Sequence, residues 1–142
     1  MPLPILIVDD EEAILFAMRE YFTTLGYDVD CARELEEAKT LLAKAQYALA
    51  ILDLRLTGSH STEGLELVEY TRQCYPSTRV IILTAYGSPE IQREALRRGA
   101  DVFLHKRRSL SEVAQVVSEL LGGDTWAVIW VRPWLVWPRR GE

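Results

Sequence analysis

The chain has 142 residues, of which 49% are hydrophobic and 26% charged, so one domain with its own core is expected. Its 16 Lys and Arg against 21 Asp and Glu give a net charge of -5, which argues against nucleic acid binding as the main activity. It has no leader-like opening and no apolar run near the roughly 18 residues of a membrane span, so a cytoplasmic protein without membrane contact is expected.

Five short apolar segments rich in β-branched residues have the pattern of β-strands. They are residues 5–8, 27–31, 49–52, 80–83 and 102–104. All but the second lack an alternation of apolar and polar residues, as strands covered on both faces do.

Helical patterns alternate with these strands. They cover residues 14–25, 34–44, 63–74 and 110–121, with one more between the Ser88-Pro89 N-cap and the C-cap glycine Gly99. Ser109 and Glu112 have the spacing of a capping box before the last helix. Five β-α units predict an α/β fold, a doubly wound, flavodoxin-like five-stranded parallel sheet of order 2-1-3-4-5 with helices on both faces.

Polar residues directly follow four of the expected strands. Asp9 and Asp10 follow the first strand, Asp53 the third and Thr84 the fourth, and Lys106 lies just beyond the fifth. Ligands of such sheets bind beyond the carboxyl ends of the strands where the strand order reverses, here between the first and third strands. The three aspartates should therefore lie side by side, with threonine and lysine at the same edge.

The charge of this acidic pocket indicates a metal ion. Three neighbouring carboxylates repel one another, so either one pKa rises or a cation lies among them. Lys106 supplies one positive charge, and one divalent cation would balance the remaining two negative charges. Hard oxygen ligands suit Mg²⁺ better than zinc, so we expect Mg²⁺ as the cofactor.

These groups together suit phosphoryl transfer. An aspartate can attack phosphorus and form an acyl phosphate when the charge on the equatorial oxygens is neutralised. In this interpretation Asp53 is the nucleophile, Asp9 and Asp10 hold Mg²⁺, Thr84 donates a hydrogen bond to the phosphoryl group and Lys106 pairs with it. Singly, each has a plainer explanation as a cap, turn or strand residue, and their shared edge favours the site.

The same residues and their spacing resemble the receiver domain of bacterial two-component response regulators, from about residue 3 to residue 122. The resemblance implies a signalling switch, not an enzyme, whose Asp53 accepts a phosphoryl group from a histidine kinase or phosphotransfer protein. It implies that the backbone carbonyl of Arg55 is a further metal ligand. It also implies that Phe103 swings inward as Thr84 moves, although Phe103 is equally well explained as a core residue of the fifth strand.

The resemblance also implies where the switch acts. A downstream protein would bind the face formed by the fourth helix, the fifth strand and the fifth helix, after phosphorylation shifts its conformation. The chain departs from the family pattern at Arg107, which follows Lys106 where a proline is usual.

The tail is the second unusual feature. Residues 123–142 contain all four tryptophans and are too short for an output domain, so we expect a domain over 1–122 and a Trp-rich tail without a domain of its own. The tail either packs back on that domain or forms a homodimer by strand pairing with a second copy.

Two functions from other classes remain open. One is a receiver-like protein-interaction scaffold that acts without phosphorylation. The other is an aspartyl phosphohydrolase of the haloacid-dehalogenase type, which requires a second acid two residues after the nucleophile, where this chain has Arg55.

Overall fold

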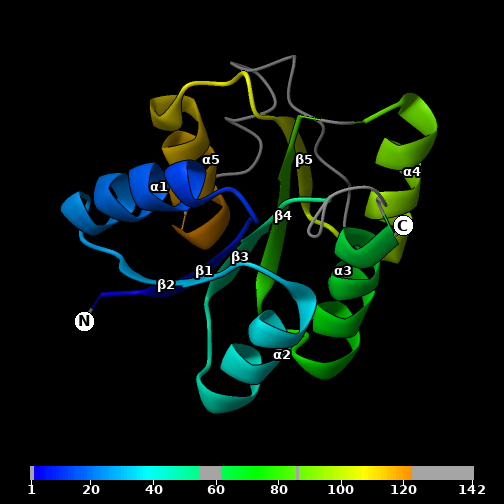
Figure 1. Ribbon diagram of the computed structural model, residues 1–142, viewed down its shortest axis with the longest axis horizontal. Coiled ribbons are helices and arrows are strands. Elements are labelled where there is room, and N and C mark those ends of the chain that lie inside the picture. The colour runs from blue at the N-terminus through cyan, green and yellow to red at the C-terminus, as the bar shows by residue number, and fades with distance from the viewer. Residues whose placement is uncertain (1, 55–61, 86, 123–142) are drawn as a thin grey trace.

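The computed structural model describes residues 2–54, 62–85 and 87–122, in which five strands alternate with five helices (Figure 1). In chain order these are β1 Pro4–Val8, α1 Glu12–Thr24, β2 Asp28–Ala32, α2 Leu35–Lys44, β3 Leu49–Leu52, α3 Thr62–Cys74, β4 Arg79–Thr84, α4 Pro89–Arg98, β5 Val102–His105 and α5 Leu110–Gly122. None of these helices combines the length and the apolar character that a bilayer span requires.

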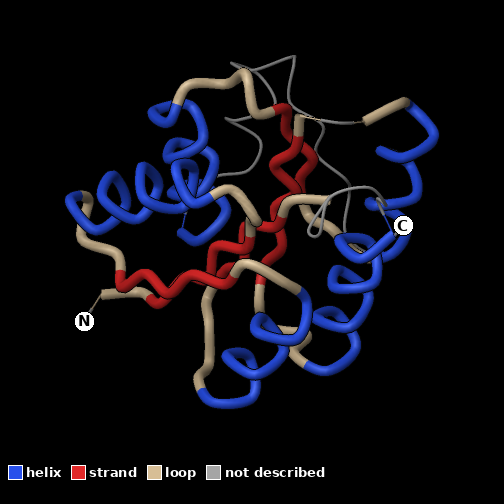
Figure 2. Tube along the Cα trace, in the orientation of Figure 1, coloured by secondary structure: helices blue, strands red, loops and turns tan. Residues whose placement is uncertain are grey.

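The strands form one parallel sheet in the order β2-β1-β3-β4-β5, which confirms the predicted doubly wound fold. Helices α1 and α5 cover one face, and α2, α3 and α4 cover the other (Figures 1 and 2). The register places Val8 of β1 opposite Leu52 of β3, so the residues that follow these two positions emerge side by side at the carboxyl edge.

Each face of the sheet has its own apolar core. In β1, Ile5 and Ile7 pack with residues of α1 and α5, whereas Leu6 and Val8 pack with residues of α2 and α3. Successive side chains of a strand point to opposite faces, so a strand covered on both faces has to be apolar throughout. This explains the absence of alternation in the strand sequences.

The helix ends follow the expected capping chemistry. The Ser88 side chain accepts a hydrogen bond from the backbone N–H of Ile91, and Gly99 ends α4 with a φ of +122°. Before α5, the Ser109 hydroxyl accepts from the Glu112 N–H at 3.2 Å and the Glu112 carboxylate accepts from the Ser109 N–H at 3.0 Å. This reciprocal pair is the predicted capping box.

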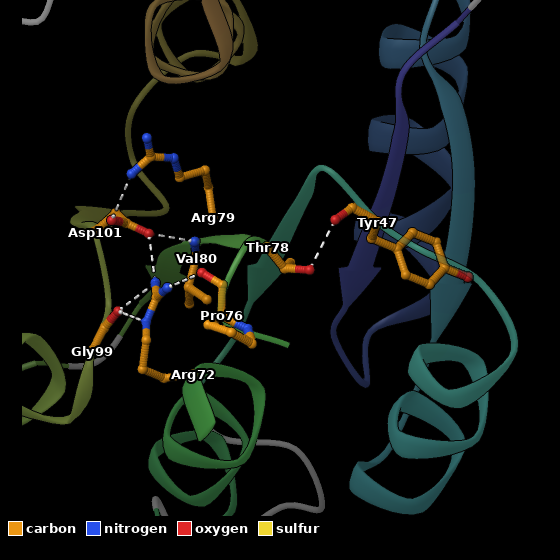
Figure 3. Close-up of polar contacts among 8 residues, drawn as sticks. All are labelled: Tyr47, Arg72, Pro76, Thr78, Arg79, Val80, Gly99 and Asp101. Atoms are coloured by element: carbon orange, nitrogen blue, oxygen red, sulfur yellow. Dashed lines mark hydrogen bonds and ion pairs between the residues drawn. The ribbon is translucent and has the colours of Figure 1, made fainter. Parts of the chain in front are cut away.

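A partly buried ionic junction joins α3, α4 and β4 at the amino ends of β4 and β5 (Figure 3). The Arg72 guanidinium donates to the carbonyls of Pro76 and Gly99 and lies 2.9 Å from the carboxylate of Asp101. Asp101 is buried and also accepts from the N–H of Val80 at 2.8 Å. One arginine therefore satisfies acceptors on two separate connections of the fold.

Replacing Arg72 with alanine should destabilise the domain, because the buried Asp101 carboxylate loses its closest cation and two carbonyls lose a donor. We expect the free energy of unfolding in urea to fall by about 1.5 to 3 kcal/mol. Arg93→Ala is the matched control, because Arg93 pairs with Glu90 at 3.9 Å on the exposed face of α4. The control should change stability by less than about 0.5 kcal/mol. Equal effects of the two changes would contradict a structural role of the junction.

Candidate functional site

Three aspartates gather at the carboxyl edge of the sheet. Oxygen atoms of Asp9, Asp10 and Asp53 all lie within 4.8 Å of one another. The backbone positions them, because the N–H of Asp53 donates to the carbonyl of Val8 at 2.9 Å and continues the β1–β3 pairing by one step. Asp9 and Asp53 are each only 3% exposed, so two of the three carboxylates are buried.

Lys106 enters the same pocket from the segment after β5. Its Nζ atom lies 2.6 Å from Asp9 Oδ2, 2.9 Å from Asp53 Oδ2 and 3.3 Å from Glu11 Oε1. The Lys106 side chain is 12% exposed, and its backbone N–H donates to the carbonyl of Thr84. The amine therefore reaches the acidic pocket although Arg107, and not a proline, follows it.

The electrostatics of the pocket reflect burial and charge together. Burial raises the pKa of Asp9 above its ordinary value, against the lowering effect of hydrogen bonds from Lys106 and from the N–H of Glu11. Burial lowers the pKa of Lys106, but hydrogen bonds to Asp9 and Asp53 and the charges of both carboxylates outweigh it and raise the pKa above its ordinary value. The lysine is therefore held in its charged form.

Sequence reasoning missed Glu11 as a member of this site. Its carboxylate is the third neighbour of the Lys106 amine, and its backbone is the N-cap of α1. Its place directly after Asp10 and directly before α1 was the signal that could have indicated it. The Glu11 side chain is 62% exposed and lies 3.3 Å from the Lys106 amine, so it lies at the rim of the pocket.

Thr84 ends β4, which is the next strand after β3, and its side chain is fully buried. The structure thus brings Thr84 to the same edge as Asp53, as the sequence predicted. Arg55 lies outside the described residues, so its carbonyl as a metal ligand stays a prediction. The Trp-rich tail over 123–142 and its homodimer lie outside them as well.

Phe103 lies in the core rather than on the surface. Its side chain is 3% exposed, packs in the cluster beneath α3 and α4, and meets the His105 ring edge-on at 6.1 Å between centroids. This position agrees with the alternative prediction, in which Phe103 is a core residue of the fifth strand. The inward swing that the family resemblance implies would have to begin from another conformation.

An apolar groove of about 230 Å³ opens beside the pocket, between α1 and α5. Lys106 and Arg108 contribute its basic rim. Its other lining residues are Ile14, Ala17, Met18, Leu83, Leu110 and Val113. The groove therefore combines apolar walls with two basic lining residues, of which Lys106 also pairs with the carboxylates of the acidic pocket.

The donor set fits the metal that the sequence predicts. Asp9, Asp10 and Asp53 offer carboxylate oxygens only, in small number, and the half-buried Asp10 leaves one side of the cluster accessible to solvent. Hard oxygen ligands with room for water are the environment that Mg²⁺ prefers. A parallel sheet with such a pocket at its switch point and a lysine just beyond β5 is the arrangement of an aspartyl-phosphate signalling domain.

Comparison with known proteins agrees with this class. Residues 5–118 match the model of the response regulator receiver domain, and the chain belongs to this family. Receiver domains are signalling switches of two-component systems that are phosphorylated on an aspartate and bind Mg²⁺ at an aspartate cluster. They interact with histidine kinases or phosphotransfer proteins.

Three relatives illustrate the range of the family. The response regulator protein PilR of Pseudomonas aeruginosa is 37% identical over 116 residues, which cover 82% of this chain and 25% of PilR. The sporulation initiation phosphotransferase F of Bacillus subtilis is 30% identical over 117 residues, covering 82% of this chain and 92% of the relative. The chain also spans 60% of the regulatory protein RegA of Rhodobacter capsulatus, at 28% identity over 113 residues and 80% of this chain.

Solved structures share the fold. A CheY-like receiver domain protein from Methanospirillum hungatei superposes with a TM-score of 0.80 at 29% identity, covering 85% of this chain and 94% of that one. A response regulator from Burkholderia pseudomallei, solved with a phosphorylated aspartic acid, a calcium ion and citrate, gives a TM-score of 0.76 at 25% identity. The matches cover 89% of this chain and 70% of that structure.

Replacing Lys106 with methionine should destabilise the domain at neutral pH by about 3 kcal/mol, because Asp9 and Asp53 stay buried without their cation. The native pKa of Asp9, already raised by burial, rises further when the amine is gone. A carboxyl group whose pKa is higher in the folded state binds protons more readily when folded. The deficit should therefore shrink as the pH falls toward the pKa of a free aspartate, about 3.9.

Urea denaturation of both proteins across this pH range measures the effect. Lys44→Met on the exposed end of α2 makes the same change of charge without a buried carboxylate and is the matched control. A deficit of Lys106→Met that stays constant over the whole pH range would contradict the electrostatic explanation.

Proposed function

We propose that this chain is a phosphorylation-dependent switch of a two-component system and that Asp53 is its phosphoacceptor. The observation that carries the proposal is the environment of Asp53. Its carboxylate is 3% exposed, lies 2.9 Å from the Lys106 amine and shares a cluster with Asp9 and Asp10. Such a carboxylate is positioned for attack on phosphorus, while bulk water is largely excluded from it.

In the proposed reaction an Asp53 carboxylate oxygen attacks the phosphorus atom of a phosphohistidine on a histidine kinase or phosphotransfer protein. The P–O bond to Asp53 forms as the P–N bond breaks, and the electron pair of that bond returns to the imidazole ring. Asp9, Asp10 and Asp53, with the carbonyl of Arg55, would hold Mg²⁺, which neutralises charge on the phosphoryl oxygens when bound.

The lysine links the reaction to a change of conformation. Phosphorylation adds about two negative charges to Asp53. Lys106, which is shared with Asp9 before the reaction, would then pair with the phosphoryl group, and the Thr84 hydroxyl would donate to it. Thr84 ends β4, which leads to α4, and Lys106 follows β5 on the way to α5, so the face of α4, β5 and α5 is the proposed binding surface for a downstream protein.

The proposed phosphodonor partner fits the groove beside the pocket. The groove walls are apolar residues of α1 and α5, and Lys106 and Arg108 lie at its rim. An amphipathic helix that carries a phosphohistidine would place apolar residues in such a groove and its phosphoryl group next to the basic rim. Residues 1–122 would form the switching domain, and 123–142 a tail without a domain of its own.

Asp53→Asn should abolish modification by a small-molecule phosphodonor in the presence of Mg²⁺, because an amide cannot act as the nucleophile. Intact-mass spectrometry would record one added phosphoryl group on the wild type and none on the variant. Asp28→Asn makes the same chemical change on an exposed part of β2, and it should leave the modification intact. A phosphorylated Asp53→Asn protein would end the assignment.

Beryllofluoride, which mimics a phosphoryl group on aspartate, separates the switch from a scaffold that works without phosphorylation. It should raise the melting temperature of the wild type only when Mg²⁺ is present, since both must meet at Asp53. At 100 times the dissociation constant the stabilisation would be about 2.7 kcal/mol. Asp53→Asn should show no such rise. A wild type that does not respond would favour the scaffold.

A further inference from the structure

Gly87 lies directly against the buried ring of Phe103. A Cβ atom added at Gly87 would lie 2.8 Å from Phe103 Cζ and 3.1 Å from Phe103 Cε1. Carbon atoms that are not bonded to each other approach to about 3.5 Å or more. The buried position of the ring is therefore compatible with glycine at position 87, and a methyl group there requires the ring or the loop to move.

The contact joins β5 to the segment between β4 and α4. Phe103 is paired in register with Ile82, and His105 with Thr84, and the ring lies on the face of the sheet that α3 and α4 cover. Gly87 is three residues after Thr84 and directly before Ser88, the N-cap of α4. The ring thus lies against a residue just before α4, the helix that follows Thr84 in the chain.

Other described glycines meet different neighbours. A Cβ at Gly64 in α3 would collide with the backbone of Leu54, and one at Gly99 would meet the Arg72 side chain. A Cβ at Gly122 would meet nothing within 4 Å. Among the glycines of the described residues, Gly87 is the one whose side-chain space is occupied by an aromatic ring.

We infer that Gly87 is a positioning residue of this domain. Its lack of a side chain admits the Phe103 ring to the buried position, and a larger residue at position 87 drives the ring to another rotamer toward the surface. Side chains occupy a few staggered rotamers, so an excluded ring changes direction in one step rather than gradually. The importance of the direction of the Phe103 ring for signalling rests on the proposed function, whereas the effect of Gly87 on that direction does not.

The direction of the ring can be measured without any phosphodonor. The chain contains three phenylalanines, and the other two provide internal references, because Phe16 is 68% exposed and Phe22 is fully buried. Phenylalanine carrying ¹³C in the ring would give separate NMR signals, and a soluble paramagnetic agent broadens those that reach solvent. In the wild type the Phe103 signal should stay sharp like that of Phe22.

In Gly87→Ala the Phe103 signal should broaden toward that of Phe16. Gly122→Ala is the matched control and should leave all three signals unchanged, since position 122 has open space. A Phe103 signal that stays as sharp in Gly87→Ala as in the wild type would overturn the inference.

A double-mutant cycle tests the same contact by stability. Gly87→Ala alone should lower the melting temperature by a few degrees, because the ring loses its buried position. With Phe103→Leu, which removes the ring atoms that the new methyl group would meet, Gly87→Ala should have little further effect. Equal effects of Gly87→Ala in both backgrounds would contradict the contact. The response of the wild type to beryllofluoride tests the proposed function separately.

Discussion

The Lys106 amine holds the carboxyl edge of this sheet together. Two buried carboxylates that emerge from adjacent strands repel each other, and the amine at 2.6 and 2.9 Å from them makes their burial tolerable. The same repulsion favours the binding of a divalent cation in the pocket. In the proposed function, it would also favour a new pairing of the Lys106 amine once Asp53 is phosphorylated. The pocket is therefore tolerated as it stands, and in the proposed function it would respond to the charge that phosphorylation adds.

Buried carboxylates are balanced differently at the two ends of the sheet. At the carboxyl edge the acids outnumber the one lysine, so charge remains to be balanced by a ligand. At the amino ends of β4 and β5, Asp101 lies between Arg72 and Arg79, and Arg72 also donates to backbone carbonyls. At the amino end the buried carboxylate thus has cations and a backbone donor from the protein itself, whereas the carboxyl edge retains unbalanced negative charge.

The sequence allowed much of this to be predicted, because strands covered on both faces leave a strong pattern and their ends share one edge. The prediction of β2 began one residue early, at Tyr27, since an edge strand with exposed aspartates has a weaker apolar signal. Glu11 and the Arg72–Asp101 junction were missed. Both depend on side chains that meet only after distant segments are brought together by the fold.

The inward position of Phe103 shows a similar limit. A strand aromatic three residues before the lysine was expected to move inward, and its ring already lies buried against Gly87 in another loop. Periodicity reports which face of a strand a residue occupies. It does not report whether a neighbouring loop leaves room for the ring.

The hydrogen bonds from Arg72 to the Gly99 carbonyl also bear on how α4 would move when the loop before it is displaced. Arg72 fastens the Gly99 carbonyl at the carboxyl end of this helix, whereas the Ser88 end continues directly into the loop from Thr84. A helix of 10 residues is about 15 Å long, so with its carboxyl end anchored by Arg72 it would rotate about that end. A small displacement of the loop would then tilt the helix instead of sliding it, with the largest movement at the end nearest the acidic pocket.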